Sequence, residues 1–169
     1  MSKKNESTLQ NLHLQFHAMV LMLCRGFMKG DLDQAHDLAQ EVFINVWNAL
    51  PEYREEASYK SWIYRITVNT CLLQIRKDKN KIKLQMENAA YVADVETAND
   101  GDEHEKMLYA AIGQLDKVER LLIMMVLEGV EYDEAARIIG ITENNLRVKI
   151  HRIKIKLKTQ IENERKRLR

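Results

Sequence analysis

The sequence predicts an all-α protein made of two small helical domains that are joined by an acidic linker. Apolar residues recur at three- and four-residue spacing along most of the 169-residue chain, which is the periodicity of amphipathic helices. Only one proline and six glycines are present to interrupt them. Charge is segregated: basic and acidic side chains number 12 and 9 in residues 1–85, 1 and 7 in residues 86–108, and 13 and 9 in residues 109–169. Two basic ends therefore flank an acidic middle.

The first domain is predicted over residues 1–85 and contains three helices. Three stretches have the apolar spacing of amphipathic helices, namely residues 9–27, 33–50 and 59–79. We expect Gly30 to end the first helix, and Asp33, a residue type that caps helix N-termini well, to begin the second. Pro51 ends that second helix and opens a loop over residues 51–60.

Residues 86–106 are acidic, rich in small residues and without a sustained apolar period, so they are predicted to form a flexible linker. The second domain follows over residues 107–169. Four helical stretches are expected in it, at residues 107–115, 117–127, 132–139 and from 143 onward. Gly140 provides a tight turn before the last helix and Thr142 its N-cap, which together form the pattern of a helix-turn-helix.

The last predicted helix has one apolar stripe and is otherwise basic or amide-bearing. The stripe consists of Leu146, Ile150, Ile153 and Leu157. On the remaining faces Asn and Arg can make bidentate contacts with base edges, and Lys can contact phosphates. Such a helix, preceded by a short helix and a glycine turn, is typical of one that enters the major groove of DNA.

No converging set of catalytic residues is visible in the sequence. It contains no phosphate-binding loop, nucleophile elbow or paired-cysteine metal motif, and His104-Glu105 lacks the second histidine of a zinc-protease helix. Cys24 and Cys71 lie in separate apolar helical stretches, where we expect buried free thiols. We therefore predict neither enzymatic activity nor a cofactor.

A metal or redox sensor is one alternative, because His13, His17 and Cys24 fall near one stripe of the first predicted helix. No fourth ligand lies near them in the sequence, so incidental histidines are favoured and no metal is predicted.

The first ten residues lack the apolar core of a signal peptide. No apolar run is longer than residues 18–24, which are too few to cross a bilayer. We expect a cytoplasmic protein that is neither exported nor membrane-spanning.

Three segments resemble the extracytoplasmic-function sigma factors of the sigma-70 family. DQAHDLAQEVFINVWNAL (33–50) resembles their region-two helix, ASYKSWIYRITVNTCLLQIRK (57–77) their promoter-melting segment, and EGVEYDEAARIIGITENNLRVKIHRIKIKL (128–157) their region four. The segments follow the family's order and cover most of the chain. The resemblance implies a transcription initiation factor that binds the clamp and flap of bacterial RNA polymerase core and promoter DNA, without a small-molecule substrate. It leaves open whether an anti-sigma factor holds the protein inactive.

The resemblance implies that Asn69 captures a flipped base of the minus-ten element and that the loop from Tyr53 to Ser61 surrounds this base. Aromatic side chains in such a loop can stack on unpaired bases. The residues implied to contact the minus-ten DNA are Tyr53, Tyr59, Lys60, Ser61, Trp62, Asn69, Arg76 and Lys77. A basic run continues to Lys83 and would hold upstream phosphates.

Two further contact sets follow from the same resemblance. Polymerase binding is implied for Asp37, Gln40, Glu41 and Asn45. Recognition of the minus-thirty-five element is implied for Asn144, Asn145, Arg147, Val148, Lys149, His151 and Arg152. Val148 departs from the small hydroxyl residue usual in the family, so we expect an altered promoter preference.

A second functional class remains open, namely a stand-alone repressor or activator that uses the helix-turn-helix alone. Such a regulator would bind a palindromic duplex as a dimer. The minus-ten-like motif around Asn69 favours the sigma factor, because a repressor has no need to capture an unpaired base.

Overall fold

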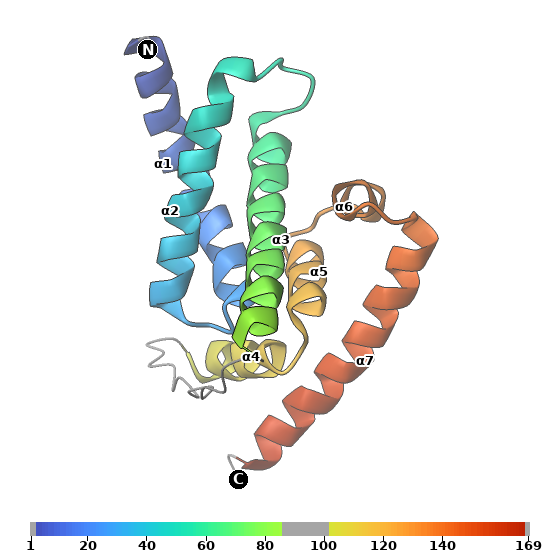
Figure 1. Ribbon diagram of the computed structural model, residues 1–169. Coiled ribbons are helices and arrows are strands. Elements are labelled where there is room, and N and C mark those ends of the chain that lie inside the picture. The colour runs from blue at the N-terminus through green and yellow to red at the C-terminus, as the bar shows by residue number, and fades with distance from the viewer. Residues whose placement is uncertain (1–2, 86–101, 168–169) are drawn as a thin grey trace.

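The computed structural model describes residues 3–85 and 102–167, with side chains described for residues 5–78 and 102–167. Regular structure within these ranges is entirely helical (Figure 1). The elements are α1 (Lys3–Phe27), α2 (Leu32–Ala49), the short 3-10 helix η1 (Leu50–Glu52), α3 (Tyr59–Gln85), α4 (Glu103–Gly113), α5 (Lys117–Leu127), α6 (Tyr132–Ile139) and α7 (Glu143–Arg167). The predicted all-α fold with two helical regions is confirmed.

Several helix ends differ from the prediction. The first helix begins at Lys3, two turns before its first apolar stripe residue. Asp33 was predicted to cap the second helix, but the cap is Asp31, whose carboxylate accepts a hydrogen bond from the Gln34 backbone N–H at 3.0 Å. The helix expected from residue 107 already begins at Glu103. Residues 86–101 of the predicted linker lie outside the described residues.

Helices α1, α2 and α3 pack against one another and enclose the N-terminal part of the core (Figure 1). Val20, Ile63 and Val68 are fully buried there. Cys24 and Cys71 are buried free thiols, as expected. The side-chain hydrogen bond with Cys24 and burial raise the pKa of the Cys71 thiol, which is part of the packing.

Helix α5 links this bundle to the C-terminal helices. It contacts α1 and α3 on one side and α6 and α7 on the other. Six consecutive residues, 120–125, are buried. An amphipathic surface helix buries one stripe only, so this continuous burial means that α5 is covered by both halves of the molecule. The core is accordingly continuous from α1 to α7.

Two close contacts fix α5 against the end of α1. A Cβ atom at Gly26 would overlap the thioether of Met124, so glycine permits this approach. The buried guanidinium of Arg120 donates from Nε to the Phe27 carbonyl at 2.9 Å and from Nη1 to the Leu115 carbonyl at 2.7 Å. Arg120 therefore satisfies the carbonyl at the C-terminal end of α1 and the one in the α4–α5 turn at once.

We predict that Arg120→Met lowers the free energy of unfolding by on the order of 1–3 kcal/mol, because two buried carbonyls lose their donor. Denaturant unfolding measures the loss. Arg137→Met on α6 is the control, since the Arg137 side chain is exposed, and it should change stability by no more than about 0.5 kcal/mol. Equal losses for both variants would contradict a specific role of Arg120.

Candidate nucleic-acid interface

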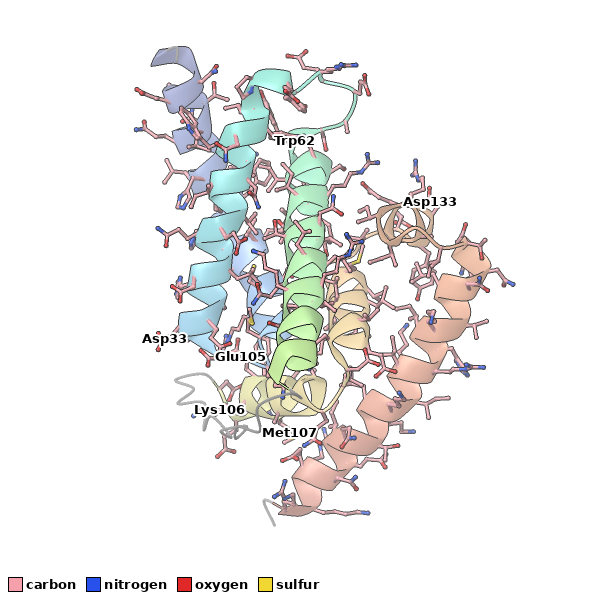
Figure 2. All side chains as sticks on the ribbon, in the orientation of Figure 1. Asp33, Trp62, Glu105, Lys106, Met107 and Asp133 are labelled. Atoms are coloured by element: carbon pink, nitrogen blue, oxygen red, sulfur yellow. The ribbon has the colours of Figure 1, made fainter. Side chains whose placement is uncertain are left out.

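The loop between α2 and α3 gathers three aromatic rings. Tyr53 stacks on Tyr59 with ring centroids 4.4 Å apart, and Trp62 lies 4.8 Å from Tyr53. The Tyr53 hydroxyl donates to the Ala57 carbonyl and closes the loop. Figure 2 shows Trp62 at the end of α3 that adjoins this loop. All three rings are only partly buried, so this cluster can stack with an unpaired base.

Asn69 is exposed in the middle of α3. Residues four apart share one face of a helix, and Arg65 and Leu73 are exposed on the same side. Arg76 and Lys77 are exposed near the far end of that helix. The sequence prediction omitted Arg65, which its position one turn before Asn69 could have revealed. The face therefore combines an amide with basic groups.

The side chains of the basic run beyond Asp78, up to Lys83, lie outside the described residues. Ser61 and Lys60 lie in the first turn of α3, where the Ser58 hydroxyl accepts a hydrogen bond from the Ser61 backbone N–H at 3.2 Å and caps the helix. The cap places the exposed Lys60 beside the aromatic loop.

The four predicted polymerase contacts on α2 divide into two pairs. Asp37 and Gln40 are exposed. Glu41 instead forms an ion pair with Lys77 of α3 at 3.3 Å, and the Asn45 amide donates to the Thr70 hydroxyl at 3.1 Å. Glu41 and Asn45 therefore also hold α2 against α3.

A groove of about 730 Å³ runs between α1 and α2. His13, His17 and His36 line it beside Phe43, and the His13 and His17 rings lie 4.7 Å apart. Burial lowers the pKa of His17, and the charges of the other two histidines lower it further. Among the described residues no group of three or more His, Cys, Asp or Glu side chains is arranged to hold a metal ion.

The turn between α6 and α7 has the predicted helix-turn-helix geometry. Gly140 adopts φ 82°, a left-handed conformation that suits glycine, and its N–H returns to the Ala136 carbonyl at 2.9 Å. The Thr142 hydroxyl accepts a hydrogen bond from the Asn145 N–H at 3.3 Å and caps α7. The predicted turn and cap are confirmed.

Helix α7 buries the predicted stripe of Leu146, Ile150, Ile153 and Leu157. All seven residues predicted to contact the minus-thirty-five element are exposed on α7: Asn144, Asn145, Arg147, Val148, Lys149, His151 and Arg152. They do not share one environment, because they lie on different sides of the helix.

Arg147 lies at the start of α7 and contacts two neighbours. Its Nε and Nη2 atoms donate to one carboxylate oxygen of Glu143 at 3.0 and 2.6 Å. Its guanidinium also lies 4.9 Å from the centroid of the Tyr132 ring. These contacts hold the guanidinium against the N-terminal end of α6.

Lys149 and Arg152 face in a different direction. They line a cavity of about 830 Å³ between α3, α5 and α7, together with acidic residues of α3 and of the start of α5. Those acidic residues are Asp78, Asp116 and Glu119. Lys156 forms an ion pair with Glu119, and Lys117 forms one with Asp78. Part of the basic side of α7 thus faces carboxylates of the same chain.

A smaller cavity of about 160 Å³ brings the start of α3 next to the turn between α5 and α6. From α3 it is lined by Lys60, Ser61 and Tyr64, and from the turn and α6 by Glu128, Glu131 and Glu134. The buried Tyr64 hydroxyl has no hydrogen-bond partner among the described residues. Burial raises the pKa of Glu128, and the charge of Lys60 partly offsets this shift.

No helix in the part of the chain that the structure describes is long and apolar enough to cross a membrane.

Comparison with known proteins gives concordant matches. Residues 12–81 match the family described as Sigma-70 region 2, and residues 105–157 match Sigma-70, region 4. The chain is 25% identical to RNA polymerase sigma factor YlaC of Bacillus subtilis over 96% of both chains. It is 26% identical to the ECF RNA polymerase sigma-E factor of Haemophilus influenzae, over 83% of this chain and 80% of that one.

A solved structure has a similar fold. The sigma factor RpoE of Bartonella quintana, in complex with the anti-sigma factor NepR, superposes with a TM-score of 0.74 at 18% identity. The match covers 90% of this chain and 96% of that one, so the fold is similar across both helical regions.

We predict that Glu128→Gln stabilises the protein at neutral pH. The folded state raises the pKa of Glu128, so the ionised carboxylate costs free energy that an amide does not. Wild-type stability should fall as pH rises through the raised pKa, and the two proteins should converge at pH values below the usual carboxyl range. Unfolding measured across pH tests this, with the exposed Glu162→Gln as control. A constant difference at all pH values would contradict it.

Proposed function

Because the chain belongs to the sigma-70 family of RNA polymerase sigma factors, of the extracytoplasmic-function type, we propose that it directs promoter-specific initiation by melting the minus-ten element and recognising the minus-thirty-five element. The observation that carries the proposal is that one chain contains both regions in the family's order. We assign residues 1–85 to region two, 86–106 to a linker and 107–169 to region four. The protein acts in the cytoplasm and performs no catalysis itself.

Region two would bind the separated minus-ten strand along α3. The aromatic cluster of Tyr53, Tyr59 and Trp62 supplies stacking surfaces at one end, and the exposed amide of Asn69 can recognise the edge of a flipped base. Lys60 and Ser61 belong to the same end, and Arg76 and Lys77 would contact upstream phosphates. We add Arg65 to this surface, because it is exposed one turn before Asn69.

The bacterial RNA polymerase core is the proposed protein partner, through its clamp and flap. Relatives that match most of this chain are named as RNA polymerase sigma factors, which supports the assignment. On α2 the exposed Asp37 and Gln40 are the accessible members of the proposed clamp contact. The side chains of Glu41 and Asn45 are bonded to α3, so they would contact the polymerase only through atoms that these bonds leave accessible. A structural relative is bound to an anti-sigma factor, so we propose such a factor here as well.

Region four would place α7 in the major groove at the minus-thirty-five element. Asn144, Asn145 and Arg147 lie in its first two turns, which approach base edges in this motif. Val148, Lys149, His151 and Arg152 follow along the exposed sides. A stand-alone repressor would use this helix too, but it would have no use for the exposed Asn69 and its aromatic loop.

We predict that the purified chain, added to core polymerase, yields transcripts from a defined subset of a promoter library. Asn69→Ala should reduce open-complex formation about tenfold or more, because a lost base contact costs roughly 1–3 kcal/mol. Polymerase binding and thermal unfolding should not change, since Asn69 is exposed. Asn11→Ala, an exposed amide on α1, is the control. Tight, polymerase-independent binding to a palindrome as a dimer would instead support the repressor.

We also predict that alanine substitutions of two residues on one side of α7 weaken DNA binding in different ways. Arg147→Ala should reduce the free energy of binding to the minus-thirty-five element by about 1–3 kcal/mol and relax the preference at one base position. Lys154 lies two turns further along the same side and can reach only phosphate. Lys154→Ala should weaken all sequences nearly equally and lower the salt slope by roughly one unit. Affinities for a minus-thirty-five library at several salt concentrations separate the two effects. If both variants lose the same affinity for every sequence, Arg147 does not recognise a base.

A further inference from the structure

The small cavity between the start of α3 and the turn from α5 to α6 carries more negative than positive charge. Its charged lining consists of Lys60, Glu128, Glu131 and Glu134. Three carboxylates against one ammonium group leave a net charge of −2 when all four are ionised. Within the described part of the chain, none of these side chains forms a hydrogen bond or a close ion pair. The cavity therefore has carboxylates whose charge the protein itself does not balance.

A buried hydroxyl lies beside these carboxylates. The Tyr64 side chain lines the same cavity and is only 4% exposed, and its hydroxyl has no hydrogen-bond partner among the described residues. Burial raises the pKa of Tyr64 far above its usual value, and the charges of Glu128 and Glu134 raise it further. A buried polar group without a partner costs free energy. The cavity thus lacks a hydrogen-bond donor as well as positive charge.

The lining suits a small organic cation better than a metal ion. In the described residues no group of carboxylates is arranged to hold a metal ion. The cavity measures about 160 Å³, well below the roughly 300–1,000 Å³ of sites for drug-sized ligands. Met19 and the ring of Tyr64 add apolar surface to the lining. A short carbon chain with an ammonium group at each end combines the two charges, the donors and the apolar body that this lining can bind.

We propose that this cavity binds a short aliphatic diamine, which donates to the Tyr64 hydroxyl and to the surrounding carboxylates. Hydrogen bonds from an ammonium group to a carboxylate are about twice as strong as neutral ones. The two positive charges balance the net charge of the lining and offset the cost of burying the Glu128 carboxylate. The inference goes beyond the proposed function, and its test needs neither polymerase nor DNA.

Calorimetric titration of the full chain with 1,4-diaminobutane at constant ionic strength tests the site. We expect one diamine bound per chain. Butylamine lacks the second ammonium group and its charge-assisted hydrogen bonds, so it should bind at least about tenfold more weakly. Magnesium chloride should also bind more weakly. Absence of diamine binding, equal binding of butylamine, or tighter binding of magnesium would each overturn the proposal.

Two variants remove groups that hold the diamine. Glu134→Gln should lower its affinity about tenfold, because a charge-assisted hydrogen bond is lost. Glu162→Gln, an exposed position on α7, is the control and should bind as the wild type does. Tyr64→Phe should lower the affinity about two- to tenfold without lowering the melting temperature of the free protein, since the hydroxyl has no bond to lose. Equal losses for Glu134→Gln and Glu162→Gln would reduce the effect to general charge screening and overturn the site.

A third variant should change the affinity in the opposite direction. Lys60→Gln removes the positive charge that competes with the diamine and keeps all three carboxylates, so the affinity should rise about threefold or more. Lys158→Gln, an exposed position on α7, is the control. This comparison decides the matter even if Glu134→Gln does not fold. If Lys60→Gln leaves the affinity unchanged or lowers it, the charge of the lining does not bind the diamine and the inference is wrong.

Discussion

The burial of α5 on both sides is the constraint on which the rest of the structure depends. Residues 120–125 are buried without a gap, because α6 and α7 cover one side of the helix and α1 and α3 cover the other. A helix-turn-helix needs only the first of these contacts. The second apolar surface would face water if the two regions separated, and its exposure would cost free energy in proportion to its area. The packing of the two regions against each other is therefore favoured by the same residues that build the C-terminal core.

Arg120 gives this contact its register. Apolar packing is tolerant of sliding, whereas the Arg120 guanidinium must meet the Phe27 and Leu115 carbonyls at the same time. The Phe27 carbonyl lies at the C-terminus of α1 and the Leu115 carbonyl lies in the α4–α5 turn, where intrahelical donors are lacking. Gly26 acts in the same direction, since only a residue without a Cβ permits the approach of Met124. One specific placement of α5 follows, and with it the placement of the turn that leads to α6.

Local patterns in the sequence predicted the helices and the helix-turn-helix, because Gly140 and Thr142 act on their immediate neighbours. The same reasoning named Asp33 as the cap where the structure has Asp31, because both residues have the right chemistry and only the backbone decides between them. The packing between the regions was not predicted. Its signal was the uninterrupted apolar run LLIMMVL in α5, but such a run does not say what covers its second side. A buried arginine within a helix gives no periodic signal at all.

Glu128 places an unfavourable charge at the contact between the α5–α6 turn and α3. It caps the C-terminus of α5, where the helix dipole disfavours a negative charge, and burial raises its pKa. Both effects are unfavourable, and the favourable charge that acts on the Glu128 carboxylate is that of Lys60. The negative charge of Glu131 lies at the N-cap of α6, where the helix dipole favours it, whereas that of Glu128 lies at the C-cap of α5, where the dipole disfavours it. Residues that break such a local preference are expected at functional contacts.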